Sequence, residues 1–193
     1  MKRFIVASAS PRRRELLENI GFRFEIIPSD ADESCEEKLS PEELVKELAK
    51  RKAESVFRKN TDSVVLGCDT VVEYGGTVLG KPSDRKEAAK MLRLLSGKVH
   101  NVHTGVYIVD KEKTVSFINT VRVEFYELSD ELIESYVSTG ESDDKAGAYG
   151  IQGLGSVLVK RISGDYFSVV GLPLSQTARA LTEFSVDNPL LKI

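Results

Sequence analysis

The stretch that organises the fold reads Phe4-Ile5-Val6-Ala7-Ser8-Ala9-Ser10-Pro11-Arg12-Arg13-Arg14-Glu15-Leu16-Leu17. Its first four residues predict a short strand, and Ser10 followed by Pro11 predicts the N-cap and first position of a helix. Arg12 and Arg13 then fall in the first helical turn, where free N–H groups make the field positive and a cation costs about 0.3–1 kcal/mol. A bound polyanion would make this pattern favourable, although arginines that point into water or pair with carboxylates would also explain it.

The composition is that of an ordinary globular protein. Of the 193 residues, 41% are hydrophobic and 30% are charged, which is enough apolar material for a core and predicts a single domain over residues 1–193. The net charge of −3 argues against non-specific binding to nucleic acid. The apolar N-terminal run is too short for a secretion signal, and no run reaches transmembrane length. We therefore expect a cytoplasmic protein that binds neither nucleic acid nor membrane.

The cysteines and histidines do not form a zinc motif. Cys35 and Cys68 are far apart in the sequence, and a disulfide between them stays open. The two histidines, His100 and His103, are interpreted as structural.

Hydrophobic periodicity predicts alternating strands and helices. Beyond the first strand, strands are expected at Phe22–Pro28, Val64–Val72, Val99–Val109, Thr114–Glu127, Ser156–Ile162 and Tyr166–Val170. Helices are expected after the caps Ser40 and Ser83, at Ser129–Val137, and from Gly171 to about Phe184, with the Ser40 helix ending near Lys59.

Three charged residues lie where a charge is unusual. Asp69 interrupts an apolar strand, where an ionised carboxylate is costly unless it is paired, hydrogen-bonded or metal-bound; this favours a functional role. Lys52 interrupts the apolar stripe of its helix, and spacing alone favours a snorkelling side chain over contact with a charged ligand. Lys81 lies at a strand end, before a proline that forces extended backbone.

The unusual residues share a chemistry. Four cations suit phosphate oxygens: Arg12, Arg13, Lys52 and Lys81. Glu33 lies in an acidic loop of a kind that is normally a solvated surface, but its carboxylate could also hold Mg²⁺ together with Asp69, phosphate oxygens and water. Because no serine, cysteine or histidine is placed in an obvious nucleophile–base pair, water activated by a carboxylate and a metal is the expected nucleophile. The residues together predict a nucleotide polyphosphate site.

A glycine-rich segment, Gly140–Gly155, breaks the pattern of regular elements. Its glycines suit a close approach of backbone to a ligand, but their spacing matches neither the dinucleotide fingerprint nor a Walker loop. Tyr149, Ile151 and Leu154 make the segment too apolar for a simple linker.

Six motifs, in order along nearly the whole chain, resemble the Maf family of nucleoside triphosphate pyrophosphatases, the septum-formation-inhibitor proteins. The matching stretches are Ala7–Leu17, Asp69–Val72, Gly80–Pro82, Val102–Val106, Asp144–Gly153 and Val169–Leu174.

The resemblance implies an α/β fold like that of the inosine triphosphate pyrophosphatases, with a central curved mixed sheet flanked by helices and a cleft between two lobes. It also implies cleavage between the α- and β-phosphates of a nucleoside triphosphate, a divalent cation (Mg²⁺ or Mn²⁺), and a homodimer.

The resemblance also implies roles for individual residues. Asp69 would accept the proton of water, and Glu33 and Asp69 would lie near the metal. The phosphates would be held by Ser8, Arg12, Arg13, Lys52 and Lys81, while Arg14 is left to solvent or a carboxylate partner.

Base choice in the resemblance is associated with Arg12, Thr70 and Gln152, the combination of a branch that acts on dTTP and UTP. A glutamine amide offers both a donor and an acceptor, which matches the N3–H and carbonyl oxygens of a uracil-type ring. Two alternatives stay open: the same reaction on another nucleotide such as 7-methylguanosine triphosphate, and a regulator of septum formation that acts by binding a protein.

Overall fold

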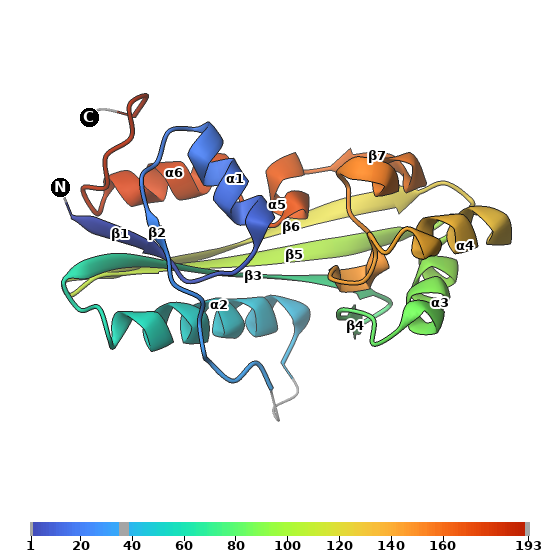
Figure 1. Ribbon diagram of the computed structural model, residues 1–193, viewed down its shortest axis with the longest axis horizontal. Helices are drawn as coiled ribbons and strands as arrows, with labels where there is room; N and C mark the ends of the chain where they lie inside the picture. Colours follow the sequence, from blue (N-terminus) through green and yellow to red (C-terminus); the bar gives the residue numbers. More distant parts are fainter. Residues whose placement is uncertain (1, 35–38, 192–193) are drawn as a thin grey trace. The chain divides into compact units, whose positions relative to one another are not determined.

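A computed structural model describes residues 2–34 and 39–191 of the chain (Figure 1). In chain order its elements are β1 (Arg3–Val6), α1 (Pro11–Asn19), β2 (Glu25–Ile26), α2 (Pro41–Phe57), β3 (Ser63–Tyr74), β4 (Thr77–Leu79), α3 (Arg85–Leu95), β5 (Val99–Val109), β6 (Thr114–Phe125), α4 (Asp130–Ser138), the 3₁₀ helices η1 (Ala146–Ala148) and η2 (Gly153–Leu158), β7 (Val159–Ser163), α5 (Tyr166–Val170) and α6 (Leu174–Thr182). This alternation of helices and strands confirms the predicted α/β class.

The strands form one seven-stranded mixed sheet. Its order is β2-β1-β3-β5-β6-β7, and β4 pairs with β3 outside this path. β1 runs parallel to both β2 and β3, whereas the β3–β4 and β6–β7 pairs are antiparallel. The mixed sheet implied by the family resemblance is therefore confirmed.

Two compact units make up the chain. Unit 1 comprises Met1–Asp69, Thr104–Asn119 and Gly171–Ile193, and unit 2 comprises Thr70–His103 and Thr120–Val170. The long strands β3, β5 and β6 each contribute residues to both units. The single domain over residues 1–193 stays a prediction.

Helix α2 begins as its sequence predicts. The side chain of Ser40 accepts a hydrogen bond from the N–H of Glu43, and the Glu43 carboxylate accepts one from the N–H of Ser40, which completes a capping box. Pro41 occupies the first turn, where its missing N–H costs nothing.

Within unit 1, α2 covers one face of the strands and α6 covers the other (Figure 1). Ala53 and Val56 of α2 pack into a core with Ile5, Val65 and Val109, which come from β1, β3 and β5. Burying such side chains stabilises the fold by about 25 cal/mol per Å² of apolar surface.

Two glycines let α2 approach the backbone of the sheet. A Cβ added at Gly67 of β3 would lie 2.2 Å from the carbonyl oxygen of Ala49, and one at Gly105 of β5 would lie 2.5 Å from that of Val45. No side chain fits at either position, so glycine here is required by packing.

Unit 2 has its own core. Helices α3 and α4 bury apolar residues against β5, β6 and η2, among them Leu92, Leu95, Phe125, Ile133 and Leu158. His100 and His103 are also buried in this unit. The Nε2 atom of His100 lies 2.8 Å from the hydroxyl of Tyr149, and burial lowers the pKa of His100 to about 4.

The predicted cap of α3 is wrong by one residue. Asp84 is the N-cap, and its carboxylate accepts a hydrogen bond of 2.8 Å from the N–H of Glu87. Ser83 instead donates its backbone N–H and its hydroxyl to the carboxylate of Glu87. Serine and aspartate are both favoured at the N-cap, and here the charged Asp84 takes that position.

The predicted strand Tyr166–Val170 is wrong, because this segment is helix α5. The Asp165 carboxylate accepts hydrogen bonds from the N–H groups of Phe167 and Ser168, at 3.2 and 3.0 Å. Asp165 therefore caps a helix, and capping satisfies backbone donors that would otherwise lack a partner at the helix start.

Two other strands are shorter than predicted. Only Glu25–Ile26 of the stretch Phe22–Pro28 forms a strand, because Phe22 and Phe24 turn onto the ring of Phe4, with centroids 5.9 and 6.0 Å away. The stretch Ser156–Ile162 begins inside the 3₁₀ helix η2 before β7 starts at Val159. Across the described ranges, no helix is both long and apolar enough to cross a membrane.

Candidate active site

Ser8 and Arg13 lie together at the end of β1. The chain leaves the sheet just beyond the pair of Val6 with Leu66, and Ser8 follows as a buried polar residue. Its Oγ accepts hydrogen bonds from the N–H of Ser10 and from Nη1 of Arg13, both at 3.2 Å. A hydroxyl that already accepts two bonds keeps its own proton to donate, which suits an anionic ligand.

Gly171 anchors the same arginine from the other end of the chain. Its carbonyl oxygen accepts hydrogen bonds from Nε of Arg13 at 2.8 Å and from the Cys68 thiol at 3.2 Å. Gly171 has a φ of 129°, a backbone conformation that favours glycine. Sequence reasoning missed this role; the motif Val169–Leu174 was a usable signal, because an isolated glycine before a proline often marks special backbone geometry.

Cys68 is a free, buried cysteine. Burial raises the pKa of its thiol, so it remains a neutral donor to the Gly171 carbonyl. Cys35, the partner considered for a disulfide, lies outside the described residues.

Lys52, Asp69 and Glu33 form a group of charged side chains in unit 1. Nζ of Lys52 lies 2.5 Å from Oδ1 of Asp69 and 3.2 Å from Oε1 of Glu33. The side chains of Lys52 and Asp69 are 12% and 11% exposed, whereas that of Glu33 is 62% exposed. The snorkelling interpretation of Lys52 is therefore wrong, because its ammonium points to two carboxylates and not into water.

The close approach of α2 to β3 positions this pair. Gly67 and Asp69 are two residues apart on β3 and so face the same side of the sheet. A Cβ at Gly67 would lie 2.7 Å from the backbone nitrogen of Ala53, the residue after Lys52. The missing side chain of Gly67 thus lets α2 bring Lys52 within reach of Asp69.

Glu33 and Asp69 can take part in binding a divalent cation. Two carboxylates that share one ammonium leave a local charge of −1, and Mg²⁺ typically takes one or two carboxylates together with phosphate oxygens and water. In the part of the chain that the structure describes, His, Cys, Asp and Glu residues do not gather in groups of three or more that could hold a metal.

Unit 2 brings two other predicted residues onto connected loops. Lys81 is exposed after β4, and Gln152 is half-buried just before η2. The N–H of Gly147 donates to the carbonyl oxygen of Gly80 at 3.0 Å, which joins the segment that precedes Lys81 to the segment that leads to Gln152.

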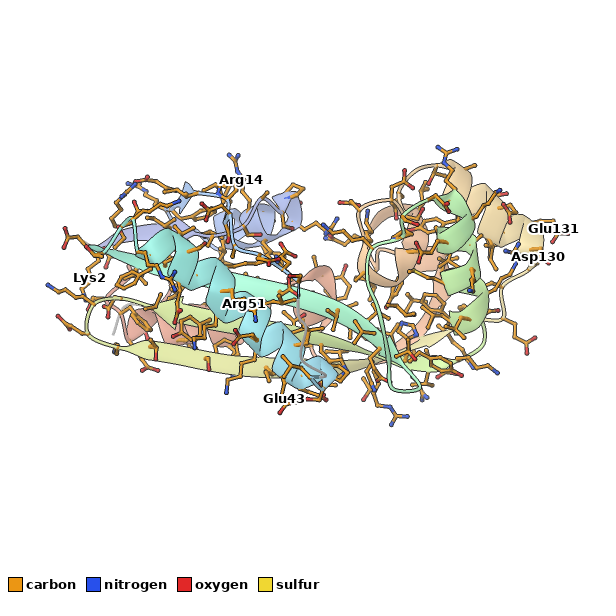
Figure 2. All side chains as sticks on the ribbon, turned by 90° about the horizontal axis from the view of Figure 1, so that it is seen from below. Lys2, Arg14, Glu43, Arg51, Asp130 and Glu131 are labelled. Carbon is orange, nitrogen blue, oxygen red and sulfur yellow. The ribbon has the colours of Figure 1, made fainter. Side chains whose placement is uncertain are left out.

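The remaining predicted residues are placed as follows. Arg12 is half-buried in the first turn of α1, and Thr70 is half-buried on β3, immediately after Asp69. Arg14 points outward from α1 in Figure 2; its side chain is 61% exposed and forms an ion pair of 2.8 Å with Glu18. The expectation of a solvent-exposed Arg14 with a carboxylate partner is confirmed.

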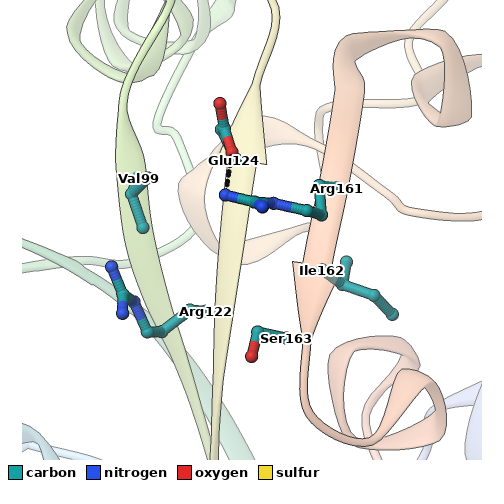
Figure 3. Close-up of a pocket in the computed structure, with 6 residues that line it drawn as sticks. All are labelled: Val99, Arg122, Glu124, Arg161, Ile162 and Ser163. Carbon is teal, nitrogen blue, oxygen red and sulfur yellow. Dashed lines mark hydrogen bonds and ion pairs between the residues drawn. The ribbon is translucent and has the colours of Figure 1, made fainter.

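A separate hollow of about 340 Å³ lies in unit 2 (Figure 3). It is lined by residues of β5, β6 and β7, namely Val99, Arg122, Glu124, Arg161, Ile162 and Ser163. Arg161 forms an ion pair of 2.9 Å with Glu124 there. The Arg161 side chain is 75% exposed, so solvent screens this pair, and the pair is a surface feature of the sheet.

The α/β fold and the cationic and acidic groups of unit 1 define a protein with a site suited to a polyanion and a cation. The chain belongs to the Maf family: the family model described as Maf-like protein matches residues 3–184. The chain is 52% identical over 187 residues to proteins named dTTP/UTP pyrophosphatase from Bacillus anthracis and from Bacillus cereus strain AH820. Each match covers 97% of this chain and 98% of the relative.

Proposed function

We propose that this protein hydrolyses dTTP and UTP to the nucleoside monophosphate and pyrophosphate. The observation that carries this proposal is the largely buried Lys52–Asp69 pair with Glu33 as a second carboxylate. The named activity of relatives that match almost the whole chain supports the choice of reaction and substrates.

In the proposed reaction, unit 1 supplies the chemistry. The Asp69 carboxylate accepts a proton from water as the water attacks phosphorus, a role of general base. Lys52 donates its N–H protons to triphosphate oxygens, and Ser8 and Arg13 donate to the same class of acceptor. Arg12 lies in the first turn of the same helix as Arg13 and is proposed for both phosphate binding and base choice.

A divalent cation, Mg²⁺ or Mn²⁺, would be held by Glu33 and Asp69 together with phosphate oxygens. When bound, it offsets phosphate charge and lowers the pKa of coordinated water. Within unit 2, Lys81 is proposed to bind phosphate, and Thr70 and Gln152 to recognise the base. The homodimer implied by the resemblance stays a prediction.

A panel of nucleoside triphosphates tests this function. Pyrophosphate release is expected for dTTP and UTP with Mg²⁺ or Mn²⁺, and is expected to fall to background when a chelator removes the cation. A preference for 7-methylguanosine triphosphate or another purine nucleotide would contradict the proposed role of Gln152. Full activity in chelator would contradict the role of the metal, and no pyrophosphate release from any nucleotide would favour a regulator that acts by binding a protein.

Replacing Gly171 with alanine is expected to raise the KM for dTTP by roughly 10- to 150-fold, with a smaller effect on kcat. The alanine side chain is strained at a φ of 129°, so the carbonyl oxygen that accepts from Arg13 must move. Losing one charge-assisted hydrogen bond typically costs about 1.5–3 kcal/mol, and 1.4 kcal/mol corresponds to a factor of ten.

Steady-state kinetics with dTTP measure this effect. Ser175→Ala, at an exposed position on the neighbouring helix α6, is the matched control and is expected to keep the parental KM. An unchanged KM in Gly171→Ala would show that the Gly171 carbonyl does not orient Arg13 for substrate.

A further inference from the structure

The carboxylate of Glu141 organises the glycine-rich segment from within. Its Oε2 accepts a hydrogen bond of 2.9 Å from the N–H of Leu154, and its Oε1 accepts one of 3.0 Å from the N–H of Gly155. The hydroxyl of Tyr136 donates to the same Oε1 at 3.1 Å. The two backbone bonds join positions 13 and 14 residues apart and so tie the two ends of the loop together.

Tyr136 adds a second anchor to the same loop. Its ring is buried in the core of unit 2, and its hydroxyl accepts a hydrogen bond of 3.2 Å from the N–H of Gly150. Gln152 therefore lies two residues after one anchored backbone position, Gly150, and two residues before the next, Leu154.

The glycines of the loop leave room for these anchors. A Cβ at Gly153, where φ is 63°, would lie 2.7 Å from Oε2 of Glu141. A Cβ at Gly155 would lie 2.3 Å from the carbonyl oxygen of Gly150 and 2.8 Å from the Tyr136 hydroxyl. Gly153 and Gly155, two of the glycines that the sequence predicted to approach a ligand, thus leave space for the Glu141 carboxylate instead.

The charge state of Glu141 fits this role. Burial favours the neutral acid, but the N–H groups of Gly155 and Leu154, the Tyr136 hydroxyl and the charge of Lys145 hold the pKa of the Glu141 carboxyl below its usual value. Lys145 also donates to the Glu141 carbonyl oxygen at 2.5 Å. An ionised carboxylate accepts at both oxygens, whereas an amide of the same shape would set its NH₂ donor against a backbone N–H.

We propose that Glu141, acting with Tyr136, is a positioning residue for base recognition: the two side chains hold the backbone on both sides of Gln152 and so fix its amide before substrate binds. This inference rests on the proposed role of Gln152 in choosing pyrimidine triphosphates. A pre-ordered loop lowers the conformational cost of binding, so its loss weakens recognition of the correct base more than it slows the chemistry.

The test compares kcat/KM for dTTP with kcat/KM for ATP in Glu141→Gln and Tyr136→Phe. In both variants the ratio of these constants is expected to fall about tenfold, through a higher KM for dTTP, while kcat stays within about twofold of the parent. Tyr136→Phe keeps the buried ring and loses only the hydroxyl, so it tests the inference even if Glu141→Gln does not fold. Glu127→Gln, an exposed glutamate in the same unit, is the matched control and is expected to keep the parental ratio.

A double-mutant cycle separates positioning from general structural support. If Glu141 acts through Gln152, then Glu141→Gln added to Gln152→Ala lowers the dTTP-to-ATP ratio no further than Gln152→Ala alone. A further fall, or an unchanged ratio in both Glu141→Gln and Tyr136→Phe when Gln152→Ala lowers it, overturns this inference and leaves the proposed function intact. An unchanged ratio in Gln152→Ala overturns the proposed basis of pyrimidine choice, and the inference with it.

Discussion

Asp69→Asn is expected to lower kcat for dTTP hydrolysis by roughly 10²–10⁴-fold, the usual contribution of a general base. Asparagine has the same shape, and its amide oxygen can still accept from Lys52, which now lies 2.5 Å from Oδ1 of Asp69. The amide cannot take a proton from water, so the proposed chemical step loses its base while the cations proposed to bind the triphosphate remain.

Pyrophosphate release at saturating dTTP measures kcat, and isothermal titration calorimetry measures whether the variant still binds the nucleotide. Binding is expected to survive largely, because Lys52 and Arg13 are unchanged. Removing one charge of a buried pair destabilises proteins by about 3–5 kcal/mol, so circular dichroism must show a folded variant at the assay temperature. Asp62→Asn, an exposed aspartate before β3, is the matched control. Hydrolysis at the parental rate in Asp69→Asn would remove Asp69 from the mechanism.

The same variant separates an enzyme from a regulator that only binds nucleotide. A protein that only binds nucleotide has no use for a proton acceptor and has no turnover for the substitution to remove. An enzyme instead loses turnover with little change in affinity. Comparing the loss of kcat with the change in nucleotide affinity is therefore more informative than either measurement alone.

The parts of the fold that sequence predicts well are those specified by neighbouring residues. The capping box at Ser40 and Glu43 joins residues three apart, so the start of α2 can be predicted from a local pattern. Asp165 shows the limit of that approach, because glycine followed by aspartate is compatible with a hairpin turn and with a helix cap. The hydrogen bonds from the N–H groups of Phe167 and Ser168 to the Asp165 carboxylate show that Asp165 caps a helix.

In the candidate site too, some features could be predicted from the sequence and others could not. The chemical types of Arg13, Lys52 and Asp69 could be predicted from charges in unusual places. Their partners could not, because the Arg13–Gly171 and Lys52–Asp69 bonds join residues 158 and 17 positions apart. Helical spacing placed Lys52 on the inner edge of α2, but only the distance between helix and strand distinguishes a snorkelling lysine from one that reaches a carboxylate. That distance depends on Gly67.

Gly67→Ala is accordingly expected to reduce both stability and activity. The new Cβ would lie 2.2 Å from the Ala49 carbonyl oxygen and 2.7 Å from the Ala53 nitrogen, and backbone atoms of a helix cannot turn away as a flexible side chain can. Overpacking of this kind costs about 1–3 kcal/mol or more. Because α2 must move away from β3 next to Lys52, the Lys52–Asp69 contact opens, and a misplacement of about 1 Å can lower the rate about 10²-fold.

Urea unfolding measures the loss of stability, and kcat for dTTP measures the loss of positioning. Gly80→Ala is the control for stability, because a Cβ there has no described atom within 4 Å. Gly105→Ala is the sharper comparison: its Cβ would press on Val45, near the start of α2 and seven residues before Lys52. Gly105→Ala should therefore lose a similar amount of stability but much less activity.

Parental stability in Gly67→Ala would contradict the close contact of α2 with β3. Equal losses of kcat in the two folded variants would show that Gly67 supports the helix as a whole and does not specifically position Lys52.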